Sequence, residues 1–134
     1  MVQYAKDRHY MTSHEWVKLE GDEAVAGISD FAQHELSDVV YVDLPGVGDV
    51  FAQGETMATV ESVKAASDIY MPVSGEIVAV NERLRDAPQL VNEDSFGAGW
   101  LVRLRPSNPE QYEALLDADA YEKQCQEEAQ QGGH

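Results

Sequence analysis

Turn signals recur at short and fairly even intervals through the middle of the chain, and they constrain the fold more than any other feature. Each is built around one or two glycines, and they fall at residues 21–22, 45–49, 53–55, 74–76 and 97–99. This spacing leaves room for short strands between the turns, but little room for the long helices of folds that alternate strand and helix. We therefore expect a mainly β core.

Three of the segments between these turns alternate in side-chain character with a period of two. That period is typical of a strand with one buried face. We expect the inward-facing sets to be Val40, Val42 and Leu44; Ile69, Met71 and Val73; and Trp100, Val102 and Leu104. Short alternating strands joined by glycine turns predict antiparallel sheets arranged as a sandwich or a small barrel.

Helices are predicted at three places outside these strands. Ser29 can cap a short helix that begins at Asp30 and ends at about Leu36. A second helical stretch begins at about residue 119 and places Tyr121 and Cys125 one turn apart, whereas the glutamate- and glutamine-rich residues 126–134 are expected to fray.

A third helical signal begins at Asn108. Its side chain is expected to act as the N-cap, Pro109 is suited to the first turn, and Gln111 is in the position of a capping-box partner. An apolar stripe follows at Tyr112, Leu115 and Leu116. We predict a single domain over residues 1–134, with a β core at about 15–105 and a helical C-terminal appendage at about 108–131.

The charge of the chain excludes several classes of partner. Nine Lys and Arg residues stand against 25 Asp and Glu residues, which gives a formal charge of −16. Nucleic-acid and anionic-membrane binding need clustered cations, and here they are few and scattered. The N-terminus lacks the apolar and Arg-rich features of targeting peptides. We expect a cytoplasmic protein, or a mitochondrial matrix protein whose transit peptide has been removed, and the high charge favours a monomer.

Residues that often carry chemistry give weak signals here. The four histidines, at positions 9, 14, 34 and 134, lack metal-ligand spacing, so we expect no metal site. The single cysteine, Cys125, cannot form an internal disulfide, and the nearby acids Glu127 and Glu128 oppose formation of a reactive thiolate. No catalytic residues are predicted, and the chain is not expected to be an enzyme.

Lys64 is the only basic residue between Lys18 and Arg83, an interval that contains thirteen acids. It lies between an extended run that ends at Val63 and a corner of small residues at 65–67, so we expect it at or near a hairpin tip. The neighbouring acids should keep its ammonium charged, which disfavours catalysis by the free amine. Acylation would instead make it the anchor of a prosthetic arm.

The sequence around this lysine, VESVKAASDIYMPVSGEIVAVNE at residues 60–82, resembles the lipoyl attachment segment of the glycine cleavage H-protein family. The resemblance continues through SHEWVK at 13–18, residues 27–49, residues 89–101 and EALLDADAYEKQCQEE at 113–128, which together cover nearly the whole chain. One departure is Phe96, where the family pattern leads us to expect tyrosine. Val63 and Ala65 beside the lysine match neither the lipoyl domains of 2-oxoacid dehydrogenases nor biotin carriers.

The resemblance implies a barrel-sandwich hybrid of two antiparallel sheets, with lipoate in amide linkage to Lys64. It also implies a shuttle that carries an aminomethyl group from a pyridoxal-phosphate glycine decarboxylase to a tetrahydrofolate-dependent aminomethyltransferase. Dihydrolipoamide dehydrogenase would then reoxidise the dithiol, and a lipoate ligase or a lipoyl or octanoyl transferase would supply the arm. We expect Ser13, Glu15 and Asp68 to hold the loaded amine by charge-assisted hydrogen bonds.

Two alternatives remain open. A related carrier could serve mainly as a lipoyl donor or relay for the lipoylation of other enzymes, and it would share every one of these motifs. The chain could instead be an acidic interaction domain in which Lys64 is unmodified. Partner assays separate the first alternative from the shuttle, and chemistry at Lys64 separates the second.

Overall fold

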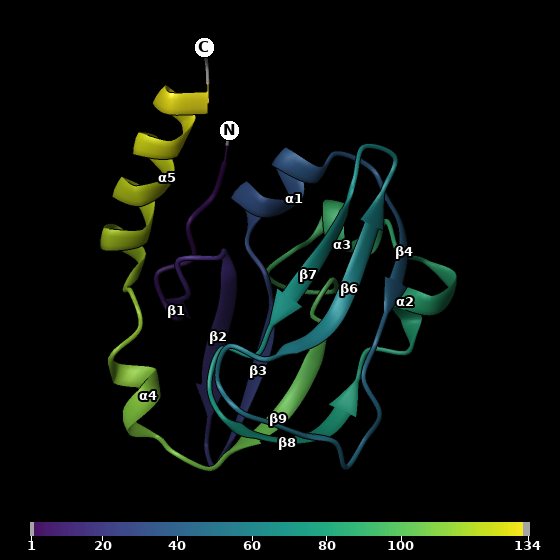
Figure 1. Cartoon of the computed structure of the whole chain (residues 1–134), viewed down its shortest axis with the longest axis vertical. Coiled ribbons are helices and arrows are strands. Elements are labelled where there is room, and N and C mark those ends of the chain that lie inside the picture. The colour runs from purple at the N-terminus through teal and green to yellow at the C-terminus, as the bar shows by residue number, and fades with distance from the viewer. Residues whose placement is uncertain (1, 133–134) are drawn as a thin grey trace.

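The computed structural model describes residues 2–132 and consists mainly of antiparallel β-strands. Six strands form one sheet in the order β1-β2-β3-β9-β8-β5, and three form a second sheet in the order β4-β6-β7 (Figure 1). Their bounds are β1 His9–Tyr10, β2 Glu15–Glu20, β3 Glu23–Ile28, β4 Val39–Asp43, β5 Val50–Phe51, β6 Thr56–Ser62, β7 Ala66–Tyr70, β8 Gly75–Val80 and β9 Val102–Pro106. The predicted mainly β fold with two antiparallel sheets is confirmed.

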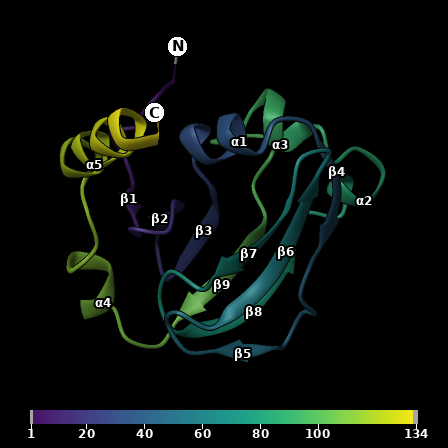
Figure 2. The ribbon, with the colours of Figure 1, turned by 45° about the horizontal axis from the view of Figure 1, so that its top comes forward.

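Five helices accompany the sheets within the described residues: α1 Asp30–Leu36, α2 Arg83–Asp86, α3 Leu90–Glu93, α4 Glu110–Glu113 and α5 Ala118–Gly132. Two views show α1 and α3 together at one end of the sheets, while α4 and α5 run along the side formed by β1 and β2 (Figures 1 and 2). None of these helices is both long and apolar enough to cross a membrane.

The main core lies between the inner faces of the two sheets and is almost entirely aliphatic. The larger sheet contributes Val17, Ala24, Ala26, Ile77, Val102 and Leu104, and the smaller sheet contributes Val39, Val42, Val60 and Ile69. Each fully buried Val, Leu or Ile side chain among them stabilises the fold by about 1.5–3 kcal/mol. Non-local strand pairing therefore brings together residues that are distant in the sequence.

A second group of buried side chains, the aromatic cluster, lies on the other face of the larger sheet. It comprises Tyr10, Trp16, Phe31, Ala118, Tyr121 and Cys125. The rings of Tyr10 and Tyr121 stack with centroids 4.2 Å apart. Both Tyr121 and Cys125 are fully buried, as expected for two residues one turn apart on the inner face of a helix. The cluster thereby fixes α5 to the sheet.

The predicted inward-facing sets were only partly right. Ile69, Met71 and Val73 are all buried, which confirms that set. In β4, however, Val42 is buried but Val40 is 53% exposed. The pairing of β4 with β6 shifts its register between Val39 and Tyr41, so an irregularity reverses the alternation before Val42. A bulge of this kind leaves no clear mark in the sequence.

In the third set, the prediction that Trp100 faces the same core as Val102 and Leu104 was wrong. Val102 and Leu104 face the main core, but Trp100 packs against the aromatic cluster, and the adjacent Leu101 is buried in the main core instead. The strand β9 begins only at Val102. Since Trp100 precedes the strand, the period of two does not extend to it.

The helix-start predictions had mixed outcomes. Ser29 caps α1, and its hydroxyl accepts a hydrogen bond from the backbone N–H of Ala32 at 3.1 Å. The predicted capping box at Asn108 was wrong, because α4 has no side-chain cap and Gln111 instead accepts a hydrogen bond from the backbone N–H of Ser74 at 2.6 Å.

The C-terminal helix is longer than predicted. The sequence predicted fraying from residue 126, but α5 continues to Gly132, and residues 133–134 lie outside the described part of the chain. Tertiary contacts explain the difference, because Gln124 donates a hydrogen bond to the carbonyl of Thr12 and Glu128 is hydrogen-bonded to His14. The predicted division into a β core and an appendage within a single domain stays a prediction.

Candidate functional site

Lys64 lies at the tip of the hairpin formed by β6 and β7. The strands pair up to Glu61 and Ala66, which leaves residues 62–65 to make the turn. The hydroxyl of Ser62 accepts hydrogen bonds from the backbone N–H groups of Lys64 and Ala65 at 3.2 and 3.0 Å. The backbone N–H of Ser62 donates to the carbonyl of Ala65 at 2.8 Å. These bonds hold the tip closed and present the exposed lysine to solvent.

The ammonium group of Lys64 reaches back to the C-terminal end of α1. Its Nζ donates to the backbone carbonyl of Glu35 at 3.2 Å. Carbonyl groups in the last turn of a helix lack helical partners, so a lysine is a favourable donor there. Among the described residues no carboxylate lies within ion-pair distance of this Nζ. The position of the lysine is therefore defined by neutral backbone groups.

A cleft of about 220 Å³ opens between α1, the start of β2, β7 and α5, and we call it the arm cleft. Its apolar surface comes from α1, β3 and β7, and its polar rim comes from serines, a histidine and two glutamates. The lining residues are Ser13, His14, Ile28, Phe31, Ala32, Glu35, Leu36, Ser67, Ile69 and Glu128. Because Glu35 lines the cleft and also binds Lys64, the lysine ends at the edge of the arm cleft.

Glu15 lies behind this cleft and is only 1% exposed. Its Oε1 accepts a hydrogen bond from the Ser13 hydroxyl at 2.5 Å, and its Oε2 accepts one from the backbone N–H of Tyr70 at 2.7 Å. Burial raises the pKa of this carboxyl above its ordinary value, and the two hydrogen bonds oppose the shift. Glu15 therefore connects β2 of the larger sheet to the end of β7 in the smaller one.

The three predicted docking residues do not meet at one point. Ser13 and Glu15 are hydrogen-bonded to each other, and Ser13 lines the arm cleft. Asp68 is exposed and does not line it; its neighbours Ser67 and Ile69 do. Side chains alternate along a strand, so Asp68 lies on the outer face of β7. The Asp68 side chain therefore does not lie with the other two, and its predicted role in docking stays a prediction.

Sequence reasoning missed three residues that shape the cleft: His14, Glu35 and Glu128. His14 adopts a positive φ of 85°, and its Nδ1 and Nε2 form hydrogen bonds to the Tyr121 hydroxyl at 2.7 Å and to Glu128 Oε1 at 3.0 Å. Its ring stacks on Phe31 with centroids 5.0 Å apart. The tertiary position of α5 creates this arrangement, so no local sequence signal could have found it.

The hydroxyl of Tyr121 also lies 2.5 Å from the hydroxyl of Ser29, the N-cap of α1. One buried tyrosine thus links α5, the start of β2 and α1, which are three walls of the arm cleft. Within residues 2–132 no group of three His, Cys, Asp or Glu side chains is arranged to hold a metal ion.

Comparison with known proteins identifies the family. The model of the family described as "Glycine cleavage H-protein" matches residues 8–128. The glycine cleavage system H protein of Carboxydothermus hydrogenoformans is 49% identical over 125 residues, which cover 93% of this chain and 96% of the relative. That of Thermus thermophilus is 53% identical over 124 residues, which cover 92% of this chain and 97% of the relative.

A solved structure agrees with these matches. The crystal structure of a glycine cleavage system H protein from Mycobacterium marinum superimposes with a TM-score of 0.81 and 37% sequence identity. The match covers 97% of this chain and 99% of that one. Sequence and fold agree over the same near-complete length, and the chain belongs to the glycine cleavage H-protein family.

Proposed function

We propose that Lys64 carries lipoate in amide linkage and that the arm cleft receives the loaded end of that arm. Membership of the family makes the chain a carrier within the glycine cleavage system, which acts together with the other components of that system. The observation that supports the site most directly is the placement of Lys64. It is exposed on a closed hairpin tip, and its ammonium lies at the edge of the arm cleft, which β7 of the same hairpin helps to line.

The local structure suits acylation of this lysine. Small residues, Ala65 and Ala66, follow it on the exposed tip and leave space for a modifying enzyme on that side. Forming the amide removes the positive charge of Nζ but leaves one N–H, which can still donate to the Glu35 carbonyl. The bound lipoyl group would supply a dithiolane that opens to accept an aminomethyl group and closes again on oxidation.

The cleft is suited to an apolar arm with a cationic end. Ile28, Phe31 and Ile69 provide the apolar surface, and the carboxylates of Glu35 and Glu128 are the charged groups of the lining. An aminomethyl group carries an amine that is protonated at neutral pH, so carboxylates favour it there. The arrangement would hold the loaded amine away from bulk water between visits to partner enzymes.

Ser13 and Glu15 have distinct roles in this proposal. The Ser13 hydroxyl donates a hydrogen bond to Glu15, so its oxygen is left free to accept a hydrogen bond from the amine. Glu15 orients Ser13 from its buried position and does not touch the arm. Asp68 belongs to the proposal only for an arm that bends over the outer face of β7, which the variant Asp68→Asn tests.

We further propose that the chain performs no catalysis itself. Its partners would be the glycine decarboxylase, the aminomethyltransferase and the dihydrolipoamide dehydrogenase, with a lipoate ligase or a lipoyl or octanoyl transferase attaching the arm. A cytoplasmic location is part of the same proposal and is supported by the bacterial origin of the relatives. Catalytic turnover of glycine by the lipoylated chain alone would contradict it.

Incubation with a lipoate ligase, lipoate and ATP tests the attachment site. We expect the intact mass to rise by one lipoyl group. Lys64 is the only trypsin site between Lys18 and Arg83, so the modified protein should yield residues 19–83 as one uncut peptide. The variant Lys64→Arg keeps the charge and should gain no mass.

An unchanged mass of the parent, with ready cleavage after Lys64, would contradict the proposal. A positive result leads to a second assay, in which the lipoylated protein supports exchange of the glycine carboxyl group with bicarbonate by a glycine decarboxylase. Lipoylation without any exchange would favour a lipoyl donor over a glycine cleavage shuttle.

A further inference from the structure

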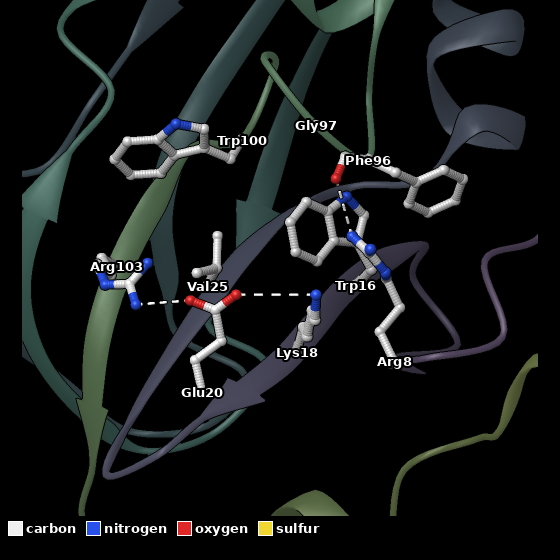
Figure 3. Close-up of a pocket in the computed structure, with 9 residues that line it drawn as sticks. All are labelled: Arg8, Trp16, Lys18, Glu20, Val25, Phe96, Gly97, Trp100 and Arg103. Atoms are coloured by element: carbon white, nitrogen blue, oxygen red, sulfur yellow. Dashed lines mark hydrogen bonds and ion pairs between the residues drawn. The ribbon is translucent and has the colours of Figure 1, made fainter.

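A second cavity of about 220 Å³ lies on the outer face of the larger sheet, and we call it the tryptophan pocket (Figure 3). Its walls come from β2, β3, the loop before β9 and β9 itself, and none of its lining residues belongs to the Lys64 hairpin. Both tryptophans of the chain, Trp16 and Trp100, line it. Figure 3 shows the two rings on either side of Val25.

The Trp16 side of this pocket is rigid and already packed. Trp16 is 1% exposed and donates its indole N–H to the carbonyl of Ser95 at 3.0 Å. The guanidinium of Arg8 lies 4.5 Å from the Trp16 ring centroid and 5.1 Å from that of Phe96. On β3, a Cβ on Gly27 would lie 2.9 Å from the Trp16 ring, so only glycine allows this close packing. Trp16 is therefore a fixed wall.

Trp100 is different because its ring is only partly buried. Its indole stands across the cavity from Trp16, with the side chain of Val25 between them (Figure 3). A half-buried indole beside an aliphatic residue offers a face on which a planar ring can stack. The apolar part of the pocket therefore suits an aromatic ring.

The charged end of the pocket is incompletely satisfied. Lys18 Nζ lies 3.4 Å from Asp7, to which it donates a hydrogen bond, and 3.8 Å from Glu20. An ammonium has three N–H donors, so this pairing does not use all of them. Arg103 uses Nε and Nη2 to bind Glu23 and Glu20, which leaves its Nη1 without a hydrogen bond in the described part of the chain. Both cations are 35% exposed in their side chains. They have donors to spare for an anion.

This concentration of cations is unusual for the chain. Three of its nine cationic residues, Arg8, Lys18 and Arg103, line this one pocket, whereas Glu20 is the single acid in the lining. The rest of a chain with a net charge of −16 would repel a free anion. Asp7 and Glu23 also pair with these cations from outside the lining, but the lining itself has a net positive charge.

We propose that the tryptophan pocket binds small planar aromatic carboxylates, with the ring stacked on Trp100 above Val25 and the carboxylate held by Lys18 and Arg103. This site is separate from the proposed lipoyl function and does not depend on it. Glu20 competes with the ligand, because its own carboxylate occupies the space between the two cations (Figure 3).

Titration of the ¹⁵N-labelled protein with benzoate tests the proposal, because only two indole N–H resonances exist and both report on this pocket. We expect saturable shifts in the millimolar range, largest for Trp100. Benzamide, a neutral compound of nearly the same shape, should bind at least about fivefold more weakly, since it lacks the charge-assisted bonds. Cyclohexanecarboxylate keeps the charge and lacks the flat ring, so it should also bind more weakly.

Charge variants test whether the cations of the pocket strengthen benzoate binding and whether Glu20 weakens it. Lys18→Met should weaken benzoate binding about five- to tenfold, because it removes one of the two cations that hold the carboxylate. Glu20→Gln should strengthen binding a few-fold, since it removes the competing carboxylate. Glu61→Gln, on the smaller sheet, makes the same change in net charge and should have little effect.

Three outcomes would overturn the proposal. Absence of indole shifts at high millimolar benzoate would show that the pocket does not bind this class. Equal binding of benzamide, or a weaker affinity in Glu20→Gln, would refute carboxylate recognition. Equal binding of cyclohexanecarboxylate would refute stacking on Trp100.

Discussion

The arm cleft and the tryptophan pocket have the same volume, about 220 Å³ each, but opposite charge. The charged lining of the arm cleft consists of the carboxylates Glu35 and Glu128, apart from the titratable His14. The tryptophan pocket has three cations and one acid. Both cavities border β2 or the turn before it. Cavity size therefore says nothing about which ligand each one takes, and the charge of the lining distinguishes them.

The alternation of side chains along β2 helps to explain how one strand serves both cavities. Trp16 and Lys18 face outward to the tryptophan pocket, whereas Val17 faces the main core. Glu15 connects the strand to β7 behind the arm cleft. A strand presents consecutive residues to opposite faces, so neighbouring positions can belong to environments of different polarity.

The largest expected effect is on lipoyl attachment beside the arm cleft, and it should leave the tryptophan pocket unchanged. Lys64→Arg should abolish lipoyl incorporation completely, because a guanidinium is not acylated by the ligase although the charge remains. Intact mass after the ligase reaction is the measurement. Lys18→Arg makes the same change at the tryptophan pocket and should be lipoylated at the parental rate. A loss of lipoylation in Lys18→Arg would show that the two cavities are not independent.

The next largest effect is a loss of folding stability when a wall of the tryptophan pocket is removed. Trp16→Ala should destabilise the fold by about 3–5 kcal/mol, because it removes a buried ring and one of the two aromatic rings that Arg8 contacts. Urea denaturation followed by circular dichroism measures this change. Trp100→Ala is the matched variant, and it should cost less because its ring is only partly buried. Equal losses would show that Trp16 is not the rigid wall described above.

Charge in the arm cleft should have a smaller effect. Glu128→Gln removes a carboxylate from the lining and also breaks the contact with His14. We expect the loaded aminomethyl group to be lost about three- to tenfold faster. Release of formaldehyde or ammonia from the isolated loaded protein gives the rate. Glu127→Gln, on the exposed side of the same helix, should release the group at the parental rate. A parental release rate in Glu128→Gln as well would show that Glu128 does not hold the loaded amine.

The pH dependence of stability should show the smallest effect, at Glu15. Burial raises the folded-state pKa of Glu15, so the folded protein binds its proton more tightly than the unfolded chain does. The ordinary pKa of this carboxyl is 4.5. As the pH rises from 4.5 through the raised pKa of the folded state, the parent should therefore lose stability relative to Glu15→Gln. Urea midpoints between pH 4 and pH 8 measure the difference. A difference that stays constant, or that favours the parent at higher pH, would contradict the shift.

Much of the fold and of the site could be predicted, and the failures have physical causes. The strands of the core, the cap at Ser29 and the hairpin position of Lys64 all follow from local rules on period, capping and turns. The prediction that Val40 faces inward was wrong because a register shift reverses the faces of β4. The capping role predicted for Gln111 was wrong because its side chain accepts a hydrogen bond from the distant backbone N–H of Ser74. Local patterns cannot register either competing partner.

The same distinction applies to the two cavities. The sequence by itself determined the mainly β class, the family and the isolation of Lys64, because these depend on composition, spacing and neighbours along the chain. Only the tertiary structure decided that Glu128 meets His14 and that Trp16 and Trp100 flank one pocket. Those pairs are far apart in sequence, and non-local strand pairing and the packing of α5 bring them together. The electrostatic character of each cavity is therefore a property of the fold.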